Sequence, residues 1–295
     1  MAKSKHGRKQ GGLTGILVKI FLLIFLVSAG ILGYLLSTYY TGQKVYDDLH
    51  SYTDIEAKQL GDVTIDWDSL RAINPDIVGW VYVPDTVISY PVVWKEDDNS
   101  YYLTHNFNNQ STQFGAEYGC IFLSGNNKSD WTNNSNFVFG HNMWNGQIFS
   151  VFSDNQGNSE WFNSHRQIYI FTPEGNYSLT TYAQIKVSGM ADDIVYTSFG
   201  SAKDMGEYVD QIKAQSIVTP SPAAKATSEM NRLFTFSTCS SPDDDMRIIT
   251  YSDVSEFYSF TDSSQNINIT AGTKGSYVSQ QSYDTISSDS AARTQ

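Results

Sequence analysis

Residues 233–251, LFTFSTCSSPDDDMRIITY, limit most strongly how this chain can fold. Two apolar runs, the first rich in Phe and Thr and the second in Ile and Thr, flank a turn made of Ser, Pro and Asp. This pattern predicts two β-strands joined by a short loop. Cys239 ends the first strand and Arg247 begins the second. The loop therefore places a thiol and a guanidinium near each other at the mouth of a sheet.

Cys239 has two interpretations. A small apolar cysteine can cap a core strand without any chemical role. Alternatively, Cys239 is a nucleophile, because the thiolate is the reactive form of cysteine and a nearby cation favours it. The only other cysteine, Cys120, could form one disulfide with Cys239. A nucleophilic Cys239 instead requires Cys120 to stay unpaired.

The charges of the chain are unevenly distributed. Its 295 residues include 31 acidic and 19 basic ones, so we expect no nucleic-acid partner. No acidic residue precedes Asp47, whereas five basic residues lie within the first 19 positions, which leaves 14 basic residues against all 31 acidic ones. A basic N-terminal segment followed by an acidic remainder indicates that the two parts of the chain lie in different compartments.

Residues 20–40 contain no charged residue and are dominated by Leu, Ile, Phe, Val and Gly. At about 1.5 Å per residue, a helix of this length spans roughly 30 Å, the thickness of a bilayer core. A cleaved signal peptide is the competing interpretation, but its apolar core is normally about 7–15 residues long. Here the segment is longer and ends in Tyr34, Tyr39 and Tyr40, which suit an interfacial belt. We therefore expect an uncleaved single-pass anchor, with residues 1–19 in the cytoplasm and everything after Tyr40 outside.

The remaining pattern predicts a mostly β domain. Residues 41–73 are expected to be helical, with one amphipathic helix at 44–60 and a second at 65–73. Strands are expected at 78–83, 87–94, 119–124, 137–141, 167–172 and 177–187, and helices at 142–154, 159–165 and 203–217. With the two strands around the Cys239 loop, this makes a closed or nearly closed eight-stranded β-barrel over residues 74–255, with a two-sheet sandwich as the alternative. Residues 256–295 are expected to be a polar, disordered tail without a packed core.

His141 lies in NFVFGHNMW, directly after an apolar strand and a glycine. A histidine in this position should emerge at the rim of the sheet, either as a surface residue or as a partner for Cys239. His105, in the aromatic cluster SYYLTHNF, is the rival partner, and His165 is weaker. The spacing of the histidines and cysteines fits no metal site, so we expect no metal or cofactor.

Together these motifs resemble the sortases, the membrane-bound cysteine transpeptidases of Gram-positive bacteria. The sortase signature is T-L-x-T-C, and residues 235–239, TFSTC, match it except for Phe in place of Leu. The N-terminal anchor, the strand ending in G-H-N and the arginine that opens the next strand complete the likeness. The resemblance covers roughly residues 74–254, and the conjunction of separated motifs makes it specific.

Several segments resemble class B sortases in particular. NPDIVGWVYVPDTVISYPVV is similar to the opening segment of that class, SYYLTHNF to its Y-L-x-x-x-F stretch, and the helix at 203–217 to its inserted helix. By this resemblance, the peptide-contacting positions of class B enzymes fall on six residues: Asn99, Leu103, Ile194, Val195, Ser237 and Thr238.

The resemblance implies an acyl transfer in which Cys239, His141 and Arg247 are catalytic. Cys239 would attack a threonine carbonyl in a C-terminal sorting signal, His141 would transfer protons, and Arg247 would stabilise the oxyanion. The expected partners are surface proteins bearing that signal and a peptidoglycan amine. A pilin polymerase that uses a lysine amine remains an alternative, although the lid and second span of such enzymes are missing from the sequence. A non-enzymatic, wall-binding β-domain is the less favoured alternative.

Overall fold

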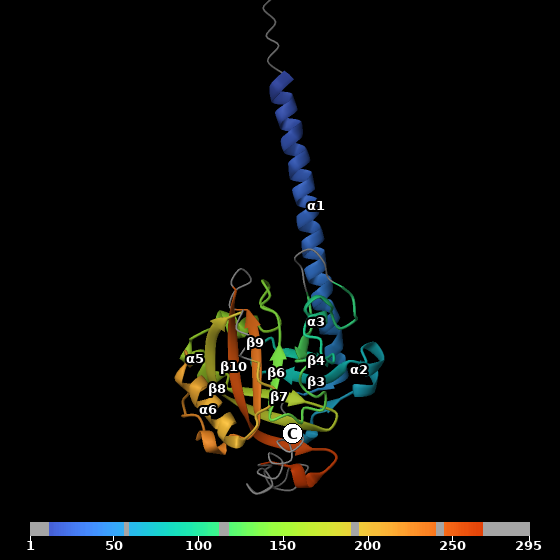
Figure 1. Ribbon diagram of the computed structural model, residues 1–295. Coiled ribbons are helices and arrows are strands. Elements are labelled where there is room, and N and C mark those ends of the chain that lie inside the picture. The colour runs from blue at the N-terminus through green and yellow to red at the C-terminus, as the bar shows by residue number, and fades with distance from the viewer. Residues whose placement is uncertain (1–11, 56–58, 112–117, 190–194, 240–244, 268–295) are drawn as a thin grey trace, which may run out of the picture.

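The computed structural model describes residues 12–55, 59–111, 118–189, 195–239 and 245–267. These residues form a closed barrel of eight strands, from which one long helix projects (Figure 1). Around the barrel the strand order is β10-β8-β7-β3-β4-β5-β6-β9. In chain order the strands are β3 (Ile77–Tyr82), β4 (Ser89–Trp94), β5 (Ile121–Leu123), β6 (Ser135–Phe139), β7 (Gln167–Phe171), β8 (Gly175–Ser188), β9 (Leu233–Cys239) and β10 (Met246–Ser259).

The prediction of a closed eight-stranded barrel is confirmed, and the sandwich alternative is wrong. Neighbouring strands are antiparallel except for two parallel pairs, β4 with β5 and β6 with β9. The β6–β9 pair closes the barrel because it joins the middle of the chain to the strand that ends at Cys239. No sheet edge is left open in a closed barrel, so every strand finds two partners.

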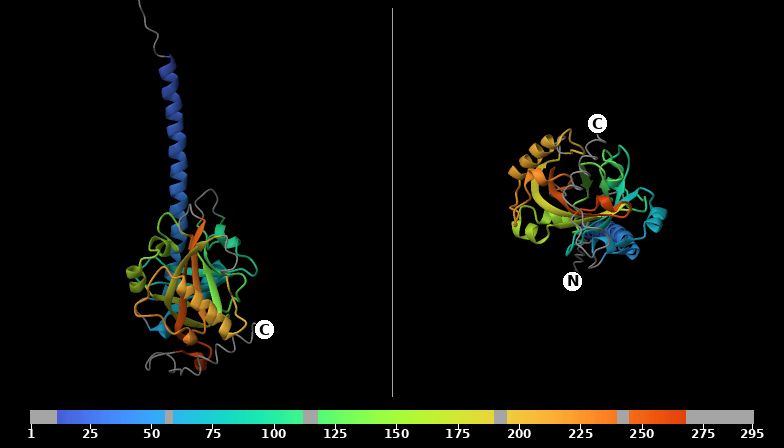
Figure 2. Two further views of the ribbon diagram at one scale, coloured as in Figure 1. Left: turned by 60° about the vertical axis from the view of Figure 1, so that its left-hand side comes forward. Right: turned by 90° about the horizontal axis from the view of Figure 1, so that it is seen from below.

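The other elements are short, apart from the first and the last helix. The helices are α1 (Gly12–Leu49), α2 (Trp67–Ile73), α3 (Tyr101–Thr104), α4 (Ser150–Asp154), α5 (Ser159–Ser164) and α6 (Ala202–Ala214). Single 3₁₀ turns lie at η1 (His50–Tyr52), η2 (Leu60–Asp62), η3 (Thr227–Glu229) and η4 (Ser263–Gln265), and β1 (Thr53–Asp54) pairs with β2 (Thr64–Ile65) outside the barrel. Figure 2 shows α1 and α6 on different sides of the barrel.

Aromatic side chains fill much of the interior. Trp80, Trp131, Phe149 and Phe236 are each at most 1% exposed and belong to one continuous apolar cluster. A second cluster lies beneath α6, where Met205, Val209 and Ile212 pack against strands of the barrel. Their spacing of four and three residues places them on one face of that helix. The aromatic content of the sequence is thus used to build the core.

Helix α1 is longer than the sequence pattern indicates. The expected amphipathic helix at 44–60 is instead the last part of α1, which ends at Leu49, and Thr53–Asp54 then forms the short strand β1. Gly42, Tyr46 and Leu49 are buried against the barrel, while the preceding apolar residues of the described helix are exposed. One uninterrupted helix therefore contains both the expected membrane segment and a face that packs on the barrel.

The segment after His141 also differs from its prediction. A helix was expected over 142–154, but the described helix, α4, begins at Ser150. Gly146 has φ +76°, and the Ser150 hydroxyl donates to the carbonyl oxygens of Met143 and Gln147 at 2.9 and 2.7 Å. A turn that needs a positive φ and is held by a side chain cannot also be helical.

The packed domain extends beyond the boundary expected at residue 255. Strand β10 continues to Ser259, and Phe257 and Ile267 exchange two backbone hydrogen bonds of 3.1 and 2.8 Å. Both side chains belong to the main core, at 5% and 4% exposure. The expected boundary at residue 255 is wrong because Phe257 and Ile267 lie ten positions apart in a polar sequence. Their contact forms only in the folded protein. The rest of the expected tail, 268–295, lies outside the described residues.

This packing predicts different results for two truncations. Ending the chain after Ser255 should lower the free energy of unfolding by about 3–6 kcal/mol, because Phe257 and Ile267 each contribute about 1.5–3 kcal/mol by burial. For a domain of this size the melting temperature should fall by roughly 10 °C or more. Ending it after Ile267 removes no described core residue and should shift the melting temperature by only a few degrees. Equal melting temperatures for the two proteins would contradict the packing role.

Candidate active site

Strand register brings Cys239, Arg247 and His141 to one edge of the barrel. Cys239 is the last residue of β9 and pairs with Arg247 of β10 in an antiparallel ladder. On the other side of β9, strand β6 runs parallel, and the Gly140 N–H donates to the Ser237 carbonyl oxygen at 3.1 Å. His141 follows Gly140 directly, so its backbone lies beside the end of β9. Both views of the ribbon place this edge at the end of the barrel from which α1 projects (Figures 1 and 2).

The ring of His141 is held by a backbone carbonyl. Its Nε2 lies 2.6 Å from the Leu103 carbonyl oxygen. A carbonyl oxygen can only accept, so Nε2 must carry the proton and donate it. In the neutral ring this leaves Nδ1 as the unprotonated nitrogen. The contact therefore selects one tautomer and fixes the plane of the ring.

The Leu103 carbonyl is itself firmly placed. The preceding residue, Tyr102, is buried, and its hydroxyl donates to Asp76 at 2.7 Å. Asn74 donates to the same hydroxyl at 3.2 Å, and the Cys120 N–H donates to the Tyr102 carbonyl at 2.9 Å. Burial and the hydrogen bond to Asp76 raise the pKa of Tyr102, so it remains a neutral donor. Asn74 and Asp76 thus support the backbone of Leu103, whose carbonyl oxygen orients His141.

Gly119 lies against both partners of this hydrogen bond. A Cβ added at Gly119 would come within 2.6 Å of the Leu103 carbonyl oxygen and 2.9 Å of the His141 Nε2. Distances below 3.0 Å force neighbouring atoms to move, and one of these atoms belongs to the backbone. Only glycine fits here without disturbing the ring of His141.

The residues after His141 form a closed turn. The Phe149 N–H donates to the His141 carbonyl at 3.1 Å, and Asn142 and Ile148 form an isolated antiparallel bridge. The Met143 N–H donates to the buried Ser150 hydroxyl at 2.6 Å. The backbone of His141 is therefore fixed from the strand before it and from the turn after it.

Arg247 lies on the other side of the Cys239 position. It pairs with Val187 of β8 as well as with Cys239, and its side chain is half-buried. A Cβ at Gly189 would lie 3.3 Å from the guanidinium carbon, so the guanidinium passes close to this glycine. The Gly189 N–H donates to the Asp245 carbonyl oxygen and closes the ladder between β8 and β10 at this edge. The Arg247 guanidinium is thus carried by a strand that is paired on both sides.

The other two histidines considered as partners are engaged locally. The ring of His105 stacks on Tyr101 with centroids 4.0 Å apart, and its Nδ1 contacts the Tyr101 carbonyl oxygen at 2.9 Å. His165 stacks in the same way on Trp161 at 4.5 Å, with its Nδ1 2.9 Å from the Trp161 carbonyl oxygen. Neither contact involves the strands that carry Cys239 and Arg247.

Cys120 is a structural cysteine. It forms no disulfide and is fully buried, and burial raises the pKa of its thiol to about 12. The thiolate is the reactive form, so Cys120 should be inert to alkylating reagents in the folded protein at neutral pH. The disulfide alternative for Cys239 is therefore wrong.

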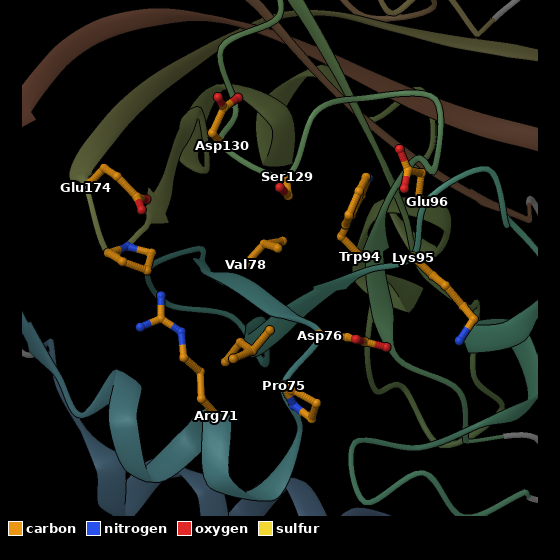
Figure 3. Close-up of a pocket in the computed structure, with 12 residues that line it drawn as sticks. Arg71, Pro75, Asp76, Val78, Trp94, Lys95, Glu96, Ser129, Asp130 and Glu174 are labelled. Carbon is orange, nitrogen blue, oxygen red and sulfur yellow. The ribbon is translucent and has the colours of Figure 1, made fainter.

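One cavity of the described structure is lined by none of Cys239, His141 and Arg247. It has a volume of about 400 Å³, and Arg71, Trp94, Asp130 and Glu174 are among its lining residues (Figure 3). Glu174 adjoins the turn between β7 and β8, where Gly175 pairs with Ser259 at the far end of β10 from Arg247. Asp76, which also lines the cavity, accepts the hydrogen bond from the Tyr102 hydroxyl, so one wall of the cavity adjoins the residues that support the Leu103 backbone.

Comparison with known proteins bears on the fold and the family of the chain. No protein-family model matches the chain. It is 28% identical to sortase B of Listeria monocytogenes over 225 residues, which cover 72% of this chain and 87% of that protein. It is 25% identical to sortase B of Staphylococcus aureus over 228 residues, which cover 76% and 88%. A crystal structure from Bacillus anthracis described as similar to sortase B has 26% identity and a TM-score of 0.61, over 73% of this chain and 96% of that one.

These sequence and structural likenesses support the sortase family, class B, for this chain. It is accordingly a sortase-type cysteine transpeptidase, and the alternative of a non-enzymatic wall-binding domain is wrong. The match covers 87% and 88% of the two relatives, so the likeness is not confined to the short motifs.

The six positions at which class B sortases are expected to contact peptide do not all lie at this edge of the barrel. Leu103 is 38% exposed. Val195 packs against the apolar cluster beneath α6, as does Val187, the β8 residue that pairs with Arg247. Ser237 and Thr238 are buried, and their side chains leave opposite faces of β9 because successive strand residues alternate. The hydroxyl oxygen of Thr238 has no hydrogen-bond partner among the described residues. Asn99 is exposed, and its side-chain oxygen accepts from the Gly125 N–H at 2.7 Å, in the connection between β5 and β6. Ile194 lies outside the described residues.

For several residues that support the catalytic positions, the sequence alone gives little indication of their role. Gly119 precedes the strand that contains Ile121, and a glycine directly before a buried strand is the only signal that it gives. Gly189 gives a similar signal at the end of β8. The role of the Leu103 backbone leaves no trace in the identity of its side chain, because any residue supplies a carbonyl oxygen.

Proposed function

We propose that this class B sortase cleaves a C-terminal sorting signal after threonine and transfers the protein to a peptidoglycan amine. Cys239 is the nucleophile, His141 the acid and base, and Arg247 the oxyanion-stabilising cation. The single observation that supports these roles is the register, which brings Cys239 of β9 opposite Arg247 of β10 and places His141, two residues after the end of β6, beside the end of β9. The surface proteins that carry the signal, and the amine of a peptidoglycan precursor, are the proposed partners.

The first half-reaction forms a thioester. The Cys239 thiolate attacks the threonine carbonyl carbon, and the carbonyl electron pair moves to the oxygen, where the Arg247 guanidinium donates hydrogen bonds to it. The tetrahedral intermediate then expels the amine of the next residue. His141 takes the proton of the Cys239 thiol on Nδ1 as the thiolate forms, and it gives this proton to that amine, because its Nε2 proton is committed to the Leu103 carbonyl. The products are a thioacyl-enzyme and a free C-terminal fragment.

The second half-reaction reverses these roles with a new amine. The incoming amine attacks the thioester carbonyl, and His141, now neutral, takes the proton that the amine loses. Collapse of the second tetrahedral intermediate restores the carbonyl and releases Cys239 as a thiolate. The net change is exchange of one amide for another, so no oxidant, metal or nucleotide is needed for the balance.

Several relatives have been solved with molecules that fit this scheme. A Staphylococcus aureus sortase B complexed with MTSET has 25% identity to this chain and a TM-score of 0.55 over 64% of this chain and 77% of that one. Sortase B has also been solved as a substrate complex and as a complex with triglycine. For this chain we infer a peptide donor and an amine acceptor of the same kind.

The proposed location is the outer face of the cell membrane. One described helix, α1, is apolar and long enough to cross a membrane, with a mean hydropathy of 2.6 over its most apolar 18 residues. The domain plan that we propose is a cytoplasmic basic segment at 1–19, an anchor at 20–40, a juxtamembrane segment at 41–73 and a catalytic barrel from residue 74. Since basic residues precede the span and acidic residues follow it, the barrel is placed outside.

This orientation predicts the outcome of a protease experiment. Protease added to intact cells from which the wall has been removed should degrade the protein beyond Tyr40, while a cytoplasmic marker stays intact. A barrel that is as well protected as the marker would contradict the orientation. Digestion of both proteins would mean that the cells had lysed, and the experiment is scored only when the marker survives.

The proposed reaction is tested by trapping its intermediate. The purified protein is mixed with a library of sorting-signal peptides without an acceptor, and the mass of the protein is measured. We expect an adduct equal in mass to the peptide up to its threonine, mapped to Cys239 and absent from Cys239→Ala. Adding triglycine or a lysine-containing peptide as acceptor then distinguishes wall anchoring from pilin polymerisation. Failure of every signal peptide to form an adduct on an active thiol would overturn the proposal.

A further inference from the structure

The last turns of α1 contact the support of His141 directly. The hydroxyl of Tyr46 donates to the Gly119 carbonyl oxygen at 2.6 Å and lies 3.5 Å from the Cys120 sulfur. The side chain is 3% exposed, and burial raises its pKa well above the ordinary value. Tyr46 is therefore a neutral hydrogen-bond donor whose acceptor on the barrel backbone is Gly119.

Gly119 is the residue against which the His141 ring and its acceptor carbonyl are packed. The space for a Cβ at Gly119 is already taken by His141 Nε2 and the Leu103 carbonyl oxygen, at 2.9 and 2.6 Å. A displacement of the Gly119 backbone toward these atoms would close the space that separates it from them. The hydrogen bond from the buried Tyr46 hydroxyl restrains that backbone.

The same helix also supports the turn that follows His141. The ring of Tyr46 stacks on Tyr118 at 5.9 Å and meets Tyr90 edge-on at 5.4 Å. Asn145 donates to the Tyr118 hydroxyl at 2.7 Å, and the Tyr90 hydroxyl donates to Gln147 at 2.6 Å. The turn is thus tied to the two rings that Tyr46 contacts.

The close approach of the helix depends on a glycine four residues before Tyr46. A Cβ at Gly42 would lie 2.7 Å from the ring of Tyr118, so a larger residue could not keep this approach. Gly42, Tyr46 and Leu49 recur at helical spacing and form the buried face of the last turns of α1. The last turns of α1 therefore form a packed interface with the barrel.

We propose that residues 42–49 of α1 are part of the active site support, and that Tyr46 is a positioning residue that orients His141 through Gly119. The membrane-anchoring helix then has a second role besides attachment, because the tautomer and ring plane of the acid–base residue depend on its docking. This inference rests on the proposed role of His141. It also implies that a soluble form of the enzyme must begin before Gly42 to keep full activity.

The test compares Tyr46→Phe with Tyr177→Phe, which removes another buried tyrosine hydroxyl that accepts a hydrogen bond from Arg232 at the far end of the barrel. Both changes keep the ring, so both proteins should fold with similar, small losses in melting temperature. For each protein we would record the ring nitrogen NMR signals of His141, assigned with His141→Asn, and the kcat and KM of transpeptidation with a signal peptide and triglycine.

We expect Tyr46→Phe to lose the single Nε2-protonated tautomer of His141 and to lower kcat about tenfold with little change in KM. Tyr177→Phe should leave both quantities at the wild-type value. An unchanged His141 signal and kcat in Tyr46→Phe would overturn the proposal, as would the same loss in both variants. The NMR measurement needs no substrate, so it still decides the positioning role if the thioacyl adduct never forms and the proposed reaction fails.

Discussion

Replacing His141 with alanine is expected to lower kcat of the transpeptidation at least ~10²-fold, the usual contribution of a general acid and base. The variant keeps the nucleophile and the oxyanion cation but has no group to protonate the leaving amine. The melting temperature should change little, because the ring lies at the rim beside the Leu103 backbone and its loss opens no core cavity. Steady-state kinetics with a signal peptide and triglycine, together with the melting temperature, check this result.

His105→Ala is the control for this prediction. His105 lies two residues from Leu103 and is held by stacking on Tyr101, so its removal tests whether loss of any nearby histidine would have the same effect. We expect His105→Ala to retain most of the activity. If His105→Ala were inactive and His141→Ala active, the assignment of the acid would have to be exchanged.

The local part of this arrangement could be predicted from the sequence. The two strands on either side of the Cys239 loop pair with each other, so their apolar content and the short connection were sufficient to place Cys239 opposite Arg247. The apolar strand and glycine before His141 likewise placed this residue at the rim of the sheet. Periodicity within one segment, or between two neighbouring segments, carries this information.

The non-local part could not be predicted. The parallel pairing of β6 with β9 joins segments about one hundred residues apart, and no property of either strand specifies that partner. The expected helix after His141 failed because Gly146 and the Ser150 hydroxyl impose a turn on residues with no strong preference. The docking of Tyr46 on Gly119 similarly depends on where a helix meets the barrel, and a tyrosine near a membrane segment is equally typical of an interfacial residue.

Arg247→Lys should cost on the order of 10²-fold in kcat, the scale for loss of an oxyanion donor. The substitution keeps the positive charge at the same strand position but replaces a planar group with several fixed donors by a single ammonium. Gly189 leaves room for the guanidinium, whose carbon lies 3.3 Å from the position that a Cβ would take there. An ammonium on a flexible stem would not be held against this surface and could not present two donors to one oxygen.

Two measurements separate oxyanion binding from activation of the thiol. The first is turnover, with Arg71→Lys on α2, outside the strands that carry the three catalytic positions, as the matched control, which should behave as wild type. The second is the rate of alkylation of Cys239 across a range of pH, where the buried Cys120 should not react. If turnover falls while the pH dependence of alkylation is unchanged, Arg247 acts on the oxyanion. If the pH dependence of alkylation shifts in parallel with the loss of turnover, the cation acts mainly by favouring the thiolate. If Arg247→Lys keeps near-full turnover, the planar guanidinium has no special part in the reaction.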